Sequence, residues 1–181
     1  MKLELAEDDR PPAELSLEEY LSSSYRPDCD FVDGQSEERN VGTFNHSRIV
    51  MWLICNLSDT HEPLEVLALP SLRMRVAPTR VRVPDVCVIE RTSPHEQILT
   101  HPPLVAIEVL DEEDCFSATI RKLADFRLFG IQNIWVIDPE PRYVYRYTAV
   151  GLEEVKTGEL TVPETPIRVV LSELFAELDR A

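Results

Sequence analysis

A single acid, Glu108, interrupts the apolar run Leu104–Leu110, and this feature restricts the fold more than any other in the chain. Apart from Glu108 the run is apolar on both faces, which is the pattern of a strand at the centre of a sheet. Burying an isolated carboxylate costs several kcal/mol unless something compensates its charge. Glu108 therefore needs a partner, and a divalent metal ion is one candidate.

The residues around this run predict a strand, strand, helix, strand unit. Apolar runs at Val83–Glu90 and Asn133–Asp138 predict two further strands, and the residues between Asp114 and Gly130 have the spacing of an amphipathic helix. The apolar face of that helix is predicted to consist of Phe116, Ile120, Leu123 and Phe126. Elements in this order predict an α/β fold of the mixed α+β type, with helices packed on a mixed sheet.

Further elements are predicted on both sides of this unit. A capping-box pattern at Ser16–Glu19 starts a short helix, and Asp30–Asn40 has the turn residues of a β-hairpin. Apolar spacing predicts a second helix over Asn45–Leu57, with His46 in its first turn. The alternation in Tyr143–Tyr147 predicts an antiparallel edge strand.

Length and composition indicate one domain. A chain of 181 residues that is 44% hydrophobic can build a single core, and we expect an acidic arm over residues 1–14 and one domain over residues 15–181. The sequence has neither an apolar run long enough to cross a membrane nor the apolar core of a signal peptide. We therefore expect a soluble, cytoplasmic protein without membrane attachment.

Charge is distributed unevenly along the chain. The formal net charge of −15 argues against broad binding to polyanions, because lysine and arginine drive phosphate binding. The segment Arg73–Arg91 is an exception, since its five arginines against two acids give a local charge of +3. A basic segment therefore surrounds Asp85.

Lys122 is the cation that the predicted fold can bring to Glu108. Side chains two apart on a strand share a face, so Leu110 occupies the place beside Glu108. The following helix rises about 12 Å up to Lys122, whereas the step back to Glu108 covers about 7 Å, so the ammonium can approach the carboxylate. The alternative is a surface lysine paired with Glu113 or Asp125 on its own helix.

Asp85 after Pro84, Glu108 and Lys122 resemble the PD-(D/E)xK motif of the restriction-endonuclease-like superfamily, in the variant with the lysine moved to the following helix. The segments DFVDGQ, RVPDV, PPLVAIEVL, RKLADF and GIQNIWVIDP more closely resemble the bacterial family of small stand-alone domains described as putative restriction endonucleases. The resemblance extends from about Ser16 to Tyr147. It implies a restriction-endonuclease-like core, in which a central mixed β-sheet is flanked by helices and preceded by an N-terminal helix and β-hairpin.

The function that this resemblance implies is an endonuclease that depends on Mg²⁺ or Mn²⁺ and hydrolyses phosphodiester bonds, with DNA as the expected substrate. Asp85, Glu108 and the backbone carbonyl of Val109 would hold the metal. Lys122 would orient the attacking water or stabilise the transition state. The basic segment would bind backbone phosphates through four arginines, which are Arg73, Arg75, Arg80 and Arg82.

Two further residues are accessory candidates. Glu38 would enter the site from the hairpin, and His46 would carry a proton or contact phosphate. The alternatives are an exposed strand position for Glu38 and a half-buried, hydrogen-bonded imidazole for His46.

One departure from the family pattern keeps a second function open. The turn after Glu108 usually reads Ser-Pro-Ser-Asp, and here it is Asp111-Glu-Glu-Asp114, whose acids would repel a phosphate. The alternative is a catalytically inactive nuclease fold that acts through protein partners or oligomerisation, and a weaker one is a hydrolase of small phosphate esters. Edge strands and three tyrosines predict a homodimer, the tyrosines being Tyr143, Tyr145 and Tyr147.

Overall fold

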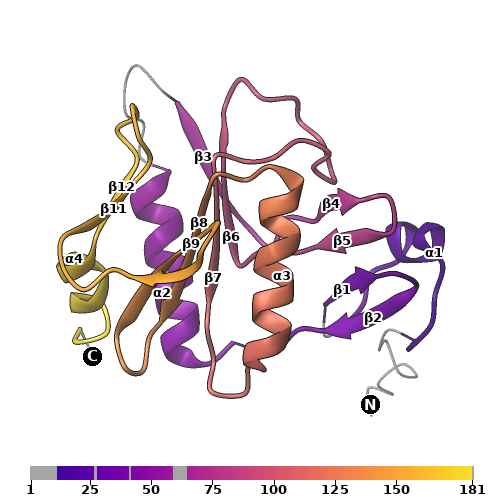
Figure 1. The fold of residues 1–181 in the computed structure, drawn as a ribbon, viewed down its shortest axis with the longest axis horizontal. Coiled ribbons are helices and arrows are strands. Elements are labelled where there is room, and N and C mark those ends of the chain that lie inside the picture. The colour runs from indigo at the N-terminus through magenta and orange to yellow at the C-terminus, as the bar shows by residue number, and fades with distance from the viewer. Residues whose placement is uncertain (1–11, 27, 41, 59–64, 181) are drawn as a thin grey trace, which may run out of the picture.

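The computed structural model describes residues 12–26, 28–40, 42–58 and 65–180. Within these residues the larger sheet has the strand order β10-β9-β8-β7-β6-β3 (Figure 1). Its strands are β3 (Val66–Pro70), β6 (Val86–Glu90), β7 (Val105–Val109), β8 (Asn133–Asp138), β9 (Tyr143–Thr148) and β10 (Gly151–Glu154). β7 and β8 are parallel and the other neighbours antiparallel, which confirms the predicted mixed sheet.

Helices cover both faces of this sheet (Figure 1). They are α2 (Phe44–Leu57) and α4 (Leu171–Ala176) on one side and α3 (Phe116–Phe129) on the other. β7 is buried throughout, and its alternate residues enter different clusters: Ile107 packs with the α2 side and Ala106 with the α3 side. Because Ala106 and Glu108 share a face of the strand, Glu108 points toward α3.

α3 follows the predicted pattern with one correction. Leu123 and Phe126 are buried, and the helix ends at Gly130, whose φ of 109° gives it the left-handed conformation of a helix C-cap. Phe116, predicted to lie on the apolar face, is instead 70% exposed, because it stands in the first turn of α3, where the neighbouring Cys115 and Ala118 line an open cleft.

A second sheet, with the order β2-β1-β5-β4, lies beside α3 (Figure 1). Its strands are β1 (Cys29–Val32), β2 (Gln35–Glu38), β4 (Met74–Ala77) and β5 (Arg80–Arg82), and α1 (Leu17–Ser22) packs against it. The strand predicted over Val83–Glu90 begins only at Val86. β5 is a separate strand that pairs with β1, and this pairing attaches the hairpin to the rest of the chain.

The predicted acidic arm is ordered at its end. Ser36 donates its N–H to the Ala13 carbonyl at 3.2 Å and its hydroxyl to the Pro12 carbonyl at 2.7 Å, so residues 12–14 belong to the hairpin. Residues 1–11 of the predicted arm lie outside the described residues. The capping box of α1 is present as predicted, with Ser16 and Glu19 bonded reciprocally.

The edge prediction for Tyr143–Tyr147 is wrong, because β9 pairs with β8 on one side and β10 on the other. The homodimer prediction therefore loses one of its grounds.

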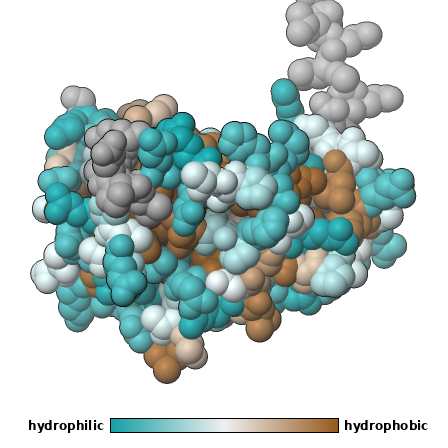
Figure 2. Space-filling view, turned by 90° about the horizontal axis from the view of Figure 1, so that it is seen from above, coloured by the Kyte–Doolittle hydropathy of each residue, from teal (hydrophilic) through white to brown (hydrophobic). Residues whose placement is uncertain are grey.

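Seen from above, the surface is mostly hydrophilic, with hydrophobic residues in small groups (Figure 2). A short ribbon of β11 (Glu159–Thr161) and β12 (Arg168–Val170) completes the described fold. In the part of the chain described, no helix has the length and apolar character needed to cross a membrane.

Candidate active site

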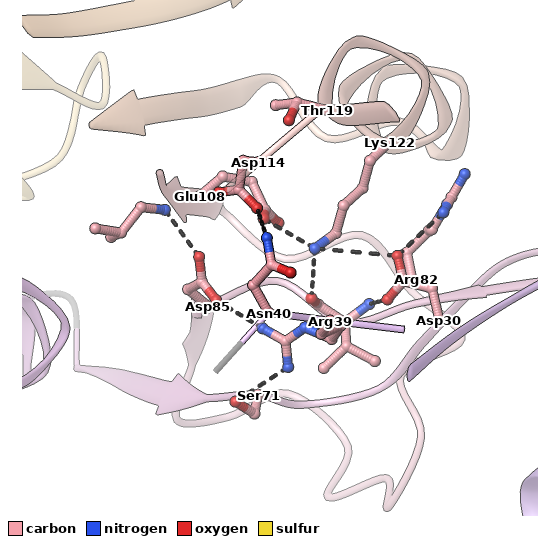
Figure 3. Close-up of polar contacts among 12 residues, drawn as sticks. Asp30, Arg39, Asn40, Ser71, Arg82, Asp85, Glu108, Asp114, Thr119 and Lys122 are labelled. Carbon is pink, nitrogen blue, oxygen red and sulfur yellow. Dashed lines mark hydrogen bonds and ion pairs between the residues drawn. The ribbon is translucent and has the colours of Figure 1, made fainter. Parts of the chain in front are cut away.

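A cleft of about 430 Å³ opens where the C-terminal end of β7 meets α3, β2 and the first turn of α2. Asp85, Glu108 and Lys122 all line this cleft, as do Val109, Glu38 and His46. The fold therefore brings the predicted catalytic and accessory residues into one place. Figure 3 draws the polar contacts around Asp85, Glu108 and Lys122.

Asp85 is a buried carboxylate held by three donors. Its Oδ1 accepts from Arg39 at 2.6 Å, its Oδ2 accepts from the Val109 N–H at 2.8 Å, and His46 Nε2 lies 3.5 Å from Oδ2. Burial by itself raises the pKa of Asp85, but the His46 hydrogen bond and the charges of Lys122 and Arg39 lower it to about 2. Asp85 is therefore ionised at neutral pH.

Glu108 is 7% exposed, and its two oxygens differ in their surroundings. Oε2 accepts from Lys122 Nζ at 2.8 Å, whereas Oε1 is buried without a hydrogen-bond partner in the described structure. Burial raises the pKa of Glu108 to about 8, although the charge of Lys122 opposes the shift. An unsatisfied buried oxygen costs about 1–3 kcal/mol, so Oε1 is a position that a cation would stabilise.

Lys122 reaches Glu108 from α3, as the rise of the helix predicts. Its Nζ also donates to the Val83 carbonyl at 2.8 Å and lies 4.0 Å from Asp30 (Figure 3). The alternative partner on the helix, Asp125, is bound to Arg82 instead. Lys122 is therefore a fixed cation at the back of the cleft.

These residues fit a metal of the magnesium type. Mg²⁺ is usually held by one or two carboxylates and completes its octahedron with water and phosphate oxygens. Asp85 and Glu108 supply two carboxylates, and the unpartnered Glu108 Oε1 is a suitable oxygen ligand. Among the described residues, no group of three or more His, Cys, Asp or Glu side chains meets to enclose a metal.

His46 is positioned by a glycine. It stands in the first turn of α2, whose N-cap Thr43 accepts from the His46 N–H, and its ring packs directly on Gly42. A Cβ at position 42 would lie 2.4 Å from His46 Nδ1. Only glycine leaves room for the imidazole beside Asp85.

Replacing Gly42 with alanine is expected to displace His46 from Asp85. Burial tends to lower the pKa of His46, but the hydrogen bond to Asp85 and the negative charges of Asp85 and Asp111 together outweigh it, so the pKa is raised in the folded protein. The displaced imidazole should titrate at a lower pH, which an NMR titration of its C–H signals would detect. Ser47→Ala, at the exposed residue next to His46 on α2, is the control. An unchanged His46 pKa would refute this positioning.

The acidic turn has a structural use. Asp111 accepts from the Thr43 hydroxyl at 2.6 Å, and Asp114 accepts from the Asn40 side chain at 2.8 Å. Two of the four acids therefore hold the segment that carries Gly42 and leads into α2. The turn ends directly before the N-cap residue of α3, which is Cys115.

The phosphate-binding prediction needs a correction at Arg82. This side chain is 1% exposed and bonded to three carboxylates: Asp125 at 2.8 Å, Asp30 at 3.1 Å and Glu37 at 2.6 Å. A guanidinium held in this way cannot contact a nucleic-acid backbone at the surface. Arg82 is a structural cation, because the fold brings acids from β1, β2 and α3 to the basic segment.

The other arginines of the basic segment differ in their contacts. Arg80 pairs with Asp33 and Asp125, and Arg73 lies 4.4 Å from the centre of the Tyr20 ring and pairs with Asp28. Arg75 is exposed, and its guanidinium donates to a backbone carbonyl. The basic segment is thus in large part an internal network of ion pairs.

Sequence reasoning missed two residues of the site, Arg39 and Arg121. Arg39 contacts Asp85 from a position 46 residues earlier in the chain, and no local pattern indicates that approach. Arg121 is exposed and lines the cleft from α3. The sequence does hold a signal for Arg121: in the RKLADF segment it directly precedes Lys122, which places it near the predicted site. Glu38 is exposed at the same cleft.

Comparisons with known proteins agree with the fold described above. A family model described as "Uma2: Putative restriction endonuclease" matches residues 17–178. The crystal structure of a putative nuclease belonging to DUF820 from Anabaena variabilis ATCC 29413 superposes with a TM-score of 0.76 and 20% sequence identity, covering 91% of this chain and 99% of that chain. No match was found among curated proteins. At 20% identity the structural likeness establishes a shared fold.

Proposed function

Because the chain belongs to the Uma2 family of putative restriction endonucleases, we propose that it is a metal-dependent endonuclease that hydrolyses phosphodiester bonds of nucleic acid, with DNA as the expected substrate. One observation carries the proposal: Glu108 is buried beside an ionised Asp85 with Oε1 unpartnered. A carboxylate left in this state is costly unless it serves a ligand, and perturbed carboxylates in a cleft are typical of catalytic sites.

Asp85, Glu108 and the carbonyl of Val109 would hold Mg²⁺ or Mn²⁺. Such an ion, when bound, lowers the pKa of a coordinated water and offsets negative charge on the scissile phosphate. The chain itself supplies Lys122, whose ammonium is fixed by Val83 and Glu108 and can orient the attacking water or stabilise the developing charge. His46, with Nε2 at 3.5 Å from Asp85 Oδ2, helps to hold the Asp85 carboxylate in place.

The direct test is an incubation with supercoiled plasmid, single-stranded DNA and RNA in Mg²⁺ or Mn²⁺. We expect cleavage of at least one polymer and its loss when the metal is chelated. Turnover of a chromogenic phosphodiester without cleavage of any polymer would favour the small-ester alternative. If neither the plasmid, nor the single-stranded DNA, nor the RNA is cleaved, the proposal is refuted.

The pKa of Glu108 predicts opposite pH dependences for metal binding and for stability. Below about pH 8 a proton competes with the metal, so Mn²⁺ binding should tighten as pH rises toward 8. The folded pKa is raised from 4.5, so the metal-free protein binds more protons than the unfolded chain, and its free energy of unfolding should fall between about pH 4.5 and 8. Calorimetric titrations at several pH values measure the Mn²⁺ affinity, and urea unfolding at the same pH values measures the free energy of unfolding. Glu108→Gln should flatten both profiles, and identical profiles in parent and variant would count against this assignment.

Arg121 is the proposed phosphate contact at the cleft, because it is exposed beside Lys122. Arg121→Ala is expected to weaken DNA binding to a similar degree for all sequences and to lower the salt slope by about one. Gel shifts in chelator over a salt series measure this slope. Arg168→Ala, exposed on β12 outside the cleft lining, is the matched control. Equal slopes for the two variants would exclude the contact.

The inactive-module alternative was based on the net charge of −15 and on phosphate repulsion by the acidic turn. Asp111 and Asp114 are hydrogen-bonded to the segment before α2, so their charge is partly engaged within the chain. We therefore favour the enzyme. The homodimer stays a prediction, and a sedimentation experiment that gives only monomer would remove it.

A further inference from the structure

Each carboxylate of the proposed metal pair already has a cation of its own. Lys122 lies 2.8 Å from Glu108, and Arg39 lies 2.6 Å from Asp85 (Figure 3). When Glu108 is ionised, as it must be to bind a metal, two negative and two positive groups compensate each other inside the cleft. A divalent ion that enters would add two charges to a site that is already balanced, and the guanidinium would repel it at short range.

The two cations differ in how firmly they are held. Lys122 extends from the middle of α3 and is fixed by both Glu108 and the Val83 carbonyl. Arg39 stands just beyond the end of β2, and its other side-chain contacts are long: 3.8 Å to Asp28 and 3.5 Å to the Ser71 hydroxyl. Arg39 is therefore the cation that can leave with the smaller loss of contacts.

The oxygen that Arg39 occupies is also the one through which Asp85 can receive a metal. Oδ2 accepts from the Val109 N–H and faces His46, so its lone pairs are engaged. Oδ1 has Arg39 as its hydrogen-bond donor. Asp28, exposed for about a third of its side chain, offers a second carboxylate to which the guanidinium can turn.

We propose that Arg39 is an internal competitor of the divalent metal: it neutralises Asp85 in the metal-free protein, and it must leave Oδ1 before the ion can bind there. Arg39 thereby lowers the metal affinity of the site. This inference rests on the proposed function, because it takes Asp85 and Glu108 as the metal pair.

The test measures Mn²⁺ binding by isothermal titration calorimetry at pH 8, without nucleic acid. Arg39→Met removes the charge and keeps the length, and the dissociation constant is expected to fall by about tenfold, the factor that one charge-assisted hydrogen bond represents. Arg48→Met is the matched control, because Arg48 is paired with Glu177 at 2.5 Å and is 22% exposed, against 17% for Arg39. Arg39→Gln serves as a second variant if Arg39→Met does not fold.

The outcomes separate this inference from the function on which it rests. Tighter binding in the Arg39 variants alone, abolished when Asp85→Asn is added, supports the competition. Equal or weaker binding in the Arg39 variants overturns it while leaving a metal-dependent nuclease in place. Binding that survives Asp85→Asn places the metal elsewhere and also overturns it. No Mn²⁺ binding in any protein overturns both the inference and the proposed function.

Discussion

Glu108→Gln is expected to reduce nucleic-acid cleavage by about a thousandfold or more, the range in which loss of a metal or of transition-state charge stabilisation falls. The amide has nearly the volume of the carboxylate but no charge with which to bind a cation. Its oxygen can still accept from Lys122, so the contact at 2.8 Å should survive. Initial rates of plasmid cleavage in Mg²⁺ measure the effect.

The control for this variant is Glu113→Gln, which changes an exposed acid that lines the same cleft. It should cleave at close to the parental rate. Circular dichroism should show both variants folded, because Gln removes the cost of a buried charge at position 108. A Glu108→Gln protein that cleaves as fast as Glu113→Gln would show that Glu108 has no catalytic role.

Arg82→Leu is expected to have the largest effect on stability, a loss of about 3–5 kcal/mol in the free energy of unfolding. Removing the guanidinium leaves Asp30 and Asp125 buried without their shared cation, and both are less than 7% exposed. Urea unfolding followed by circular dichroism measures the loss. Arg75→Leu, at an exposed position on β4, should change stability by less than about 1 kcal/mol.

A loss below about 1 kcal/mol for Arg82→Leu would mean that the network is not stabilising. The network also matters for the site, because Arg82 joins β1, β2 and α3. Asp125 lies one turn beyond Lys122 on α3, so a break at Arg82 should also loosen the ammonium. The basic segment thus contributes to the cleft by holding in place the strands and the helix that line it.

Much of the central unit could be predicted because its signals are local. The apolar run around Glu108 specifies a buried strand, and the 3.6-residue spacing before Gly130 specifies α3. The geometry of a strand followed by a returning helix then brings Lys122 to Glu108 with little freedom. The buried strand, the helix and the approach of Lys122 to Glu108 all follow from residues close together in the chain, and the structure shows all three.

The parts that could not be predicted depend on long-range pairing. β5 has only three residues, and it forms because β1, about 50 positions earlier, supplies its partner. Arg39 reaches Asp85 for the same reason, since the hairpin folds back over the start of β6. Counting charges located the basic segment but could not show that Asp30, Glu37 and Asp125 would meet Arg82.

The central claim is that Asp85 and Glu108 together hold a divalent metal, and a crystal soaked in Mn²⁺ tests it most directly. We expect an anomalous-scattering peak within about 2.0–2.3 Å of a carboxylate oxygen of each residue, with Glu108 Oε1 as one ligand. The peak should be absent from Glu108→Gln crystals soaked in the same way. A peak that contacts neither residue, or no peak at a concentration of Mn²⁺ that supports cleavage, would contradict the account.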